Sequence, residues 1–226
     1  MAASLRRWRL PGLIAAVFIT CGCNLSGLTY FLFNGKDVHP PECAELAAPA
    51  KEIKILILAS LGTEVRPEFL RTDRDVSDAL ARLLRERYKI NQDKITIVPP
   101  NQVESFKDKN PAWHTMDVQE IGDRFHADFV INLELDKLSL YEPRSMNELF
   151  RGQGEVSVSV FDAHKPGEGP VFRREFSFQY PVRGPKPVMD ANNPAQFRAE
   201  FLAYMVKELS RCFASYTMDQ KYACEE

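Results

Sequence analysis

The sequence predicts an α/β fold: a mixed sheet of about five strands with helices packed on it, in the order β-α-β-α-α-β-β-β-α. Three observations lead to this fold class. An almost unbroken aliphatic run covers residues 53–59, apolar residues recur at helical spacing over 72–88, and alternating apolar residues dominate 129–180. A continuous apolar run is typical of a strand buried on both faces, whereas alternation is typical of a strand with one exposed face.

The first half of the domain is predicted to be a β-α-β unit. After the first strand, Thr72-x-x-Asp75 forms a capping signal ahead of an amphipathic helix. Residues 94–98 are predicted as a second strand, parallel to the first, because such crossovers join parallel strands. A short helix over 101–107 follows, and Asp117 caps a clearer one.

The second half is predicted to be antiparallel. The strand that begins at Phe129 alternates apolar and polar residues, but its phase slips before Leu138, as happens at a β-bulge. Two more alternating strands follow, and Asn193-Pro194 supplies a cap and a first-turn proline for the last helix. We therefore assign residues 53–218 to one domain and 219–226 to a C-terminal tail.

The first 22 residues have the features of an export signal. Three arginines at positions 6, 7 and 9 precede an uncharged run over 10–20. A run of that length suits the apolar region of a signal peptide and is too short to cross a bilayer alone.

Thr20-Cys21-Gly22-Cys23 resembles the lipobox of bacterial lipoproteins, although Thr20 stands where Leu or Val is usual. The resemblance implies that Cys23 is the acylated first residue of the mature protein and that a palmitate-type chain anchors it in the membrane. Residues 23–52 are then the lipid anchor and a proline-containing tether. The resemblance also implies the periplasmic face of the envelope. Asn24, in place of Asp, favours the outer membrane.

Two other interpretations of the N-terminus stay open. Residues 10–33 contain no charged side chain and are long enough for an uncleaved transmembrane helix, although Pro and Gly interrupt them. Plain secretion is the third interpretation. All three place the domain outside the cytoplasm, because the arginines precede the apolar run.

Cysteine spacing gives no metal site. If Cys23 is lipidated and Cys21 removed, Cys43, Cys212 and Cys224 remain, so at most one bridge forms within the chain. Cys212 and Cys224 are the nearest pair in sequence, and a bridge between them would fasten the tail to the last helix.

Catalytic and nucleotide-binding patterns do not stand out. The chain has no G-x-G-x-x-G, P-loop or G-x-S-x-G motif, and its four histidines are not spaced to share a metal. The net charge of −2 gives no overall basic balance for nucleic acid. We expect no enzyme and no cofactor. The alternative is a small-ligand or catalytic site at residues 60–64, where the first strand ends.

A partner surface is expected where the bulged strand turns into the next one. This stretch carries Tyr141, Met146, Leu149 and Phe150, and loops that expose such residues often dock partners. The alternative is that Leu149 and Phe150 simply begin the next strand. Pro185, in the proline-rich stretch 181–187, belongs either to a partner ledge or to an ordinary crossover.

The order of elements and the lipobox-like start resemble a group of bacterial envelope lipoproteins. The group includes the curli-secretion lipoprotein, the penicillin-binding-protein activator lipoproteins and the N-terminal domain of the Tol-system translocation protein. Tyr141-Glu142-Pro143 and Val160-Phe161-Asp162 are similar to lipoproteins of planctomycete-type bacteria. The resemblance implies a non-enzymatic factor that binds an envelope protein or supports assembly. A self-associating structural protein, a homo-oligomer, is a further alternative.

Overall fold

The computed structural model describes residues 38–46, 51–62, 66–188 and 193–217. Cys23, Cys224 and the whole export signal lie outside these ranges. The chain divides into two compact units, residues 1–39 with 217–225 and residues 40–216 with Glu226, and the second unit holds the sheet. Two short strands, β1 (Val38–His39) and β8 (Tyr216–Thr217), pair with each other in a separate two-stranded sheet.

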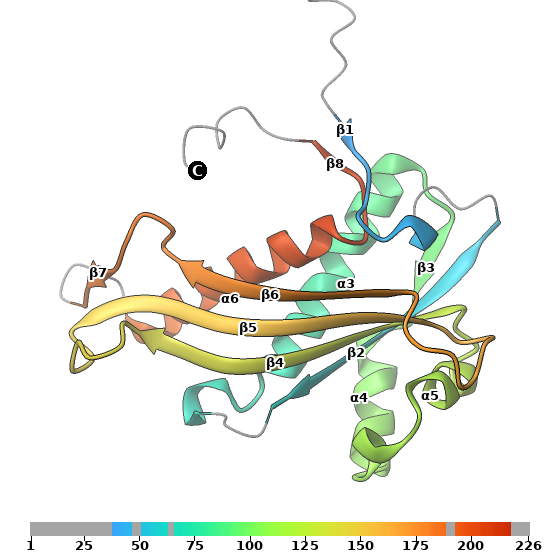
Figure 1. Cartoon of the computed structure of the whole chain (residues 1–226), viewed down its shortest axis with the longest axis horizontal. Coiled ribbons are helices and arrows are strands. Elements are labelled where there is room, and N and C mark those ends of the chain that lie inside the picture. Colours follow the sequence, from blue (N-terminus) through green and yellow to red (C-terminus); the bar gives the residue numbers. More distant parts are fainter. Residues whose placement is uncertain (1–37, 47–50, 63–65, 189–192, 218–226) are drawn as a thin grey trace, which may run out of the picture. The chain divides into compact units, whose positions relative to one another are not determined.

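The main sheet is mixed, as the sequence predicts, and its strand order is β3-β2-β4-β5-β6 (Figure 1). The central strand β2 is parallel to both of its neighbours, whereas β4, β5 and β6 run antiparallel to one another. A short sixth strand, β7, pairs with the start of β5. The bounds are β2 (Ile53–Leu61), β3 (Ile95–Ile97), β4 (Phe129–Tyr141), β5 (Leu149–Asp162), β6 (Phe172–Tyr180) and β7 (Lys186–Pro187).

Helices cover both faces of β2. The described helices are α3 (Thr72–Asn91), α4 (Pro100–Lys109), α5 (Val118–Arg124) and α6 (Pro194–Arg211), with the short 3-10 turns η1 (Ala44–Leu46), η2 (Pro67–Phe69) and η3 (Trp113–Thr115). Ile55 and Ile57 pack in the larger core with α3 and α6, while Leu56 and Leu58 pack in the smaller core with α4 and α5. This two-sided burial is what the continuous aliphatic run predicts.

The phase slip in β4 is a real irregularity of the sheet. The register of β4 against β5 shifts between Asp136 and Ser139, and Lys137 adopts a φ of 50°. This bulge turns Leu138 and Leu140 back toward the core, where they are 3% and 2% exposed. The predicted β-bulge is confirmed.

Two of the three predicted helix caps are present. Asp117 accepts a hydrogen bond from the amide of Gln119 at 2.8 Å, and Asn193 accepts one from the amide of Ala195 at 2.7 Å. Each satisfies an amide that the first helical turn leaves without a partner inside the helix.

The third predicted cap, at Thr72 and Asp75, is wrong. Arg71 occupies the N-cap of α3 and makes no side-chain cap bond. The Thr72 hydroxyl and the Asp75 carboxylate instead accept hydrogen bonds from Arg198 Nη2 of α6, at 2.8 and 2.7 Å. The two side chains do make hydrogen bonds, but their partner is Arg198 of a distant helix, so they join α3 to α6 instead of capping α3.

Part of the expected tether belongs to the folded unit. Cys43 and Leu46 are 0% and 1% exposed and pack in the larger core. The Cys43 amide donates to the carbonyl of Cys212, which follows α6, at 2.9 Å. The described structure therefore adds residues before Ile53 to the domain.

Candidate functional site

The turn between β4 and β5 is a rigid projection at one end of the sheet. The Glu142 amide donates to the Leu149 carbonyl at 3.0 Å, and the Glu148 amide donates to the Ser145 carbonyl at 2.9 Å. Three non-glycine residues of this turn, Arg144, Met146 and Asn147, have φ values of 68°, 52° and 64°. Such backbone is unfavourable for a side chain and persists only where the surrounding contacts fix it.

Met146 stands at the tip of this turn with 92% of its surface exposed. The proline-rich stretch returns to the same place, because β7 pairs with the start of β5 and the Val188 amide donates to the Glu148 carbonyl at 2.9 Å. Pro185, the residue before β7, is exposed beside the turn. The structure thus brings together two stretches that are almost 40 residues apart in sequence.

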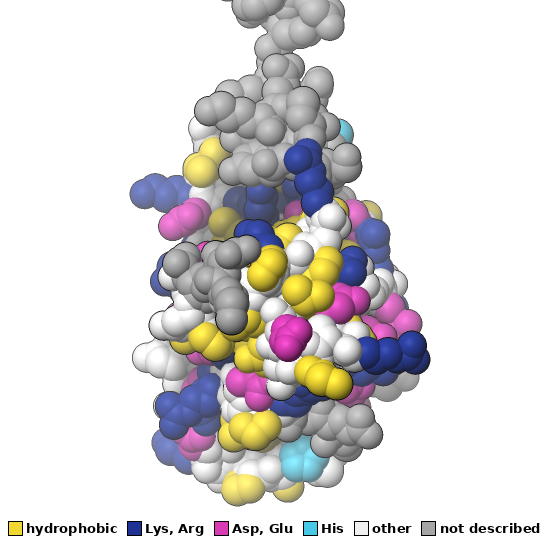
Figure 2. Space-filling model, turned by 90° about the vertical axis from the view of Figure 1, so that its left-hand side faces the viewer, with side chains coloured by type: hydrophobic (Ala, Val, Ile, Leu, Met, Phe, Trp, Pro, Cys, Tyr) yellow, Lys and Arg dark blue, Asp and Glu magenta, His cyan; other side chains and the backbone are white. Residues whose placement is uncertain are grey.

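We call Tyr141, Met146, Leu149 and Pro185 the hairpin surface. Tyr141 and Leu149 are half-buried, and Met146 and Pro185 are exposed. Figure 2 looks onto this end of the molecule, where hydrophobic side chains gather among acidic and basic ones. Tyr and Met, both present in the hairpin surface, are among the residues enriched at protein–protein interfaces.

Phe150 does not belong to the hairpin surface, which corrects one of the five expected residues. Its side chain is 0% exposed and stacks on Phe197 of α6 at 4.7 Å and on Tyr141 at 5.2 Å between ring centroids. Leu149 and Phe150 are the first residues of β5, as the alternative interpretation predicts. Because side chains alternate along a strand, Phe150 faces the core while its neighbour faces outward.

A groove of about 400 Å³ adjoins the hairpin surface. Tyr141 is common to both, and the groove combines this end of β4 and its turn with residues from η2 and the start of α6. The lining residues are Arg66, Pro67, Glu68, Leu140, Tyr141, Asn147 and Pro194. The sequence offers no signal for this groove, because η2 and the start of α6 reach it only through the tertiary fold.

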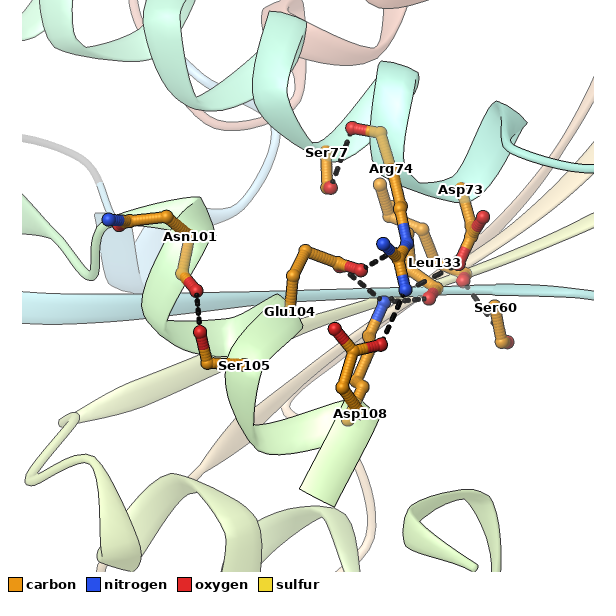
Figure 3. A network of polar contacts seen from close by, with 11 residues as sticks. Ser60, Asp73, Arg74, Ser77, Asn101, Glu104, Ser105, Asp108 and Leu133 are labelled. Atoms are coloured by element: carbon orange, nitrogen blue, oxygen red, sulfur yellow. Dashed lines mark hydrogen bonds and ion pairs between the residues drawn. The ribbon is translucent and has the colours of Figure 1, made fainter. Parts of the chain in front are cut away.

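The end of β2, where the ligand-site alternative was placed, carries a buried polar cluster (Figure 3). Its centre is Lys107 of α4, whose side chain is 5% exposed. The ammonium group donates to the Ala59 carbonyl at 2.8 Å and pairs with Glu104 at 3.0 Å and Asp73 at 3.5 Å. The Trp113 ring lies 4.8 Å from the same nitrogen.

The polar cluster has its own charges satisfied. The Lys107 ammonium donates a hydrogen bond to the Ala59 carbonyl of β2 and forms ion pairs with one carboxylate of α3 and one of α4. Arg74 of α3 then pairs with Glu104 and Asp108, each at 2.7 Å. Ser60 donates to the Leu133 carbonyl at 3.4 Å. The arrangement ties α3 and α4 to β2, and Thr63 and Glu64 of the expected site lie outside the described residues.

A second polar hollow, of about 540 Å³, lies between α5 and the turn that follows β5. The buried Gln119 amide donates to the carbonyls of Lys165 and Glu168, and its oxygen accepts from the Gly167 amide at 3.0 Å. These bonds fasten the turn to α5. Within the described ranges, no group of three or more His, Cys, Asp or Glu residues is arranged to hold a metal ion.

His164 of this turn pairs with Asp128 at 3.0 Å. Burial of Asp128 opposes its ionisation, but hydrogen bonds from His164 and from the Lys54 amide outweigh burial and hold the pKa of that carboxyl below its ordinary value. Asp128, which precedes β4, thereby joins the start of β2, through the Lys54 amide, to the turn between β5 and β6.

The glycine pair Gly152 and Gly154 is a packing device. A side-chain carbon added at Gly152 would lie 2.5 Å from Phe201 of α6, and one added at Gly154 would lie 2.7 Å from Leu138. The glycines therefore allow α6 and the bulged part of β4 to approach β5 closely.

The expected bridge between Cys212 and Cys224 falls partly outside the described residues, since Cys224 is not among them. Cys212 itself is a buried free cysteine, as is Cys43.

No protein-family model matches the chain, and no curated protein matches it. Several solved structures do, and bacterial lipoproteins are among them. Lipoprotein GNA1162 from Neisseria meningitidis is 11% identical, with a TM-score of 0.43, over 70% of this chain and 98% of that one.

The PelC dodecamer from Paraburkholderia phytofirmans is 12% identical, with a TM-score of 0.41, over 78% of this chain and 95% of that one. An uncharacterised lipoprotein B from Nitrosomonas europaea is 11% identical, with a TM-score of 0.31, over 71% and 82%. At these values the likeness assigns no function to this chain.

Across the described residues, no helix is both long enough and apolar enough to pass through a membrane. The export signal, and with it the segment 10–33, lies outside those residues.

Proposed function

We propose that the chain is a non-enzymatic envelope lipoprotein that binds a protein partner through its hairpin surface. The lipobox-like Thr20-Cys21-Gly22-Cys23 supports anchoring through Cys23, and Asn24 supports the outer membrane. A resemblance to the group of curli-secretion, penicillin-binding-protein activator and Tol N-terminal proteins also favours a role in protein binding or assembly.

One observation carries the binding role: Met146, 92% exposed, is held at the tip of a turn with three left-handed residues. An exposed apolar side chain gains nothing for folding, and left-handed backbone costs about 1 kcal/mol or more per residue. A turn that keeps both features is built for contact with another molecule. The adjoining groove adds a concave surface that an inserted side chain could fill.

The ligand-site alternative has weaker support. Lys107 and Arg74 beside the end of β2 are engaged by carboxylates of the same domain. A substrate that bound Lys107 or Arg74 would have to displace those carboxylates. A displaced carboxylate that stayed buried would lose its ion pair, which is energetically costly.

Site-specific photo-crosslinking in the intact envelope tests the binding role. A photoreactive amino acid replaces Met146 in the full-length protein, and the control replaces Ile90, which is 78% exposed at the end of α3. We expect an adduct at position 146 and none at position 90. An adduct of twice the chain's own mass would favour the self-associating alternative, and no adduct at position 146 would contradict the proposal.

A further inference from the structure

The segment before β2 is attached to the end of α6 through two cysteines. Figure 1 shows η1, in blue, beside the C-terminal end of α6, in red. The Cys43 amide donates to the Cys212 carbonyl at 2.9 Å, and both side chains are 0% exposed in the same core. Arg174 of the edge strand β6 pairs with Glu42, which holds the segment against the sheet.

The two backbones are at the separation that a disulfide needs. Backbone segments joined by an N–H···O=C bond lie roughly 5 Å apart, and disulfides span roughly 4.4–6.8 Å between α-carbons. The thiols also share their surroundings: Cys212 Sγ lies 3.6 Å from Glu42 Oε2, one residue from Cys43. Burial raises the pKa of Cys212 to about 12, and the nearby Cys43 thiol raises it as well.

We propose that Cys43 and Cys212 form a disulfide bond in the exported protein. The inference rests on the export part of the proposed function and is independent of partner binding. Compartments outside the cytoplasm permit disulfides. The sequence points instead to Cys212 and Cys224, the nearest pair along the chain; the fold brings Cys43 to Cys212 across 169 positions.

The bond forms by exchange with an oxidising disulfide, such as that of a periplasmic thiol oxidase or of oxidised glutathione. One cysteine thiolate attacks the oxidant and forms a mixed disulfide, and the second cysteine displaces the remaining oxidant thiol. Two protein thiols and one oxidant disulfide give one protein disulfide and two oxidant thiols. Burial raises the pKa of Cys43 to about 12, so the folded thiols stay protonated and exchange precedes burial.

Peptide mapping of the full-length protein tests this bond directly. The protein is unfolded in urea, free thiols are blocked with N-ethylmaleimide at mildly acidic pH, and the unreduced protein is cut with trypsin. Cys43 falls in peptide 37–51, Cys212 in peptide 212–221 and Cys224 in peptide 222–226. We expect 37–51 linked to 212–221. Blocked thiols on 37–51 and 212–221, or a link between 212–221 and 222–226, would overturn the proposal.

Thermal unfolding supplies a second measurement. Reduction with dithiothreitol, Cys43→Ala and Cys212→Ala should each lower the Tm by a similar amount, on the order of 10 °C. Dithiothreitol should have no further effect on either variant, and Cys224→Ala should behave as the wild type. Equal sensitivity of wild type and Cys43→Ala to dithiothreitol would contradict the bond.

Discussion

Lys107→Met is expected to lower the free energy of unfolding by about 3–5 kcal/mol. The substitution keeps roughly the length of the side chain but removes the buried ammonium group that pairs with Glu104 of α4 and Asp73 of α3. The Ala59 carbonyl also loses its hydrogen-bond donor, and this loss is costly because Ala59 is fully buried in β2. The expected loss in the free energy of unfolding is large because the polar groups that contact Lys107 stay buried without the cation.

Urea unfolding of the purified domain measures this loss. Arg124→Met is the matched control, because Arg124 makes an exposed pair with Glu120 one turn away, and such pairs contribute about 0–1 kcal/mol. Adding Asp73→Leu to Lys107→Met should recover part of the stability, since it removes the carboxylate that pairs with Lys107, whereas Glu104 keeps its pair with Arg74. A Lys107→Met variant as stable as Arg124→Met would contradict the structural role of the cluster.

Phe150→Ala is expected to lower the free energy of unfolding by about 3–5 kcal/mol, whereas Met146→Ala should change it by less than about 0.5 kcal/mol. Phe150 is fully buried between Tyr141 and Phe197, so its truncation leaves a cavity between β5 and α6. Met146 makes almost no contact that folding would lose.

A third variant, Met146→Asp, separates stability from binding. Met146→Asp should fold as the wild type in urea and lose capture by the partner that crosslinks at position 146. A large loss of stability at Met146, or none at Phe150, would reverse the assignment of core and surface at this end of the sheet.

The order of strands and helices along the chain could be predicted because it depends on local periodicity. Ile55, Leu56, Ile57 and Leu58 have no polar residue between them, and only a strand covered on both faces can bury them all. The bulge could be predicted for the same reason, because Leu135 and Leu138 fall out of phase. Asp117 and Asn193 cap helices through neighbours two or three residues away.

Features that depend on distant partners could not be predicted. Thr72 and Asp75 have the spacing of a cap, but Arg198, more than 120 positions later, is their partner. Leu149 and Phe150 are adjacent apolar residues, and only the position of α6 decides that Phe150 is core. Cys43 lies in a stretch whose composition predicts a tether, and only the fold shows that this stretch is hydrogen-bonded to Cys212. Long-range contacts of this kind leave no period in the sequence.

Membrane attachment through Cys23 is the central claim about where this protein acts, because export alone would also fit an uncleaved anchor or plain secretion. Its most direct test is the intact mass of the protein extracted from membranes, compared for wild type, Cys23→Ala and the control Cys21→Ala. We predict that wild type and Cys21→Ala begin at residue 23 and carry acyl chains, whereas Cys23→Ala carries none. A wild-type chain that starts upstream of Cys23, or that starts there without acyl mass, would contradict the account.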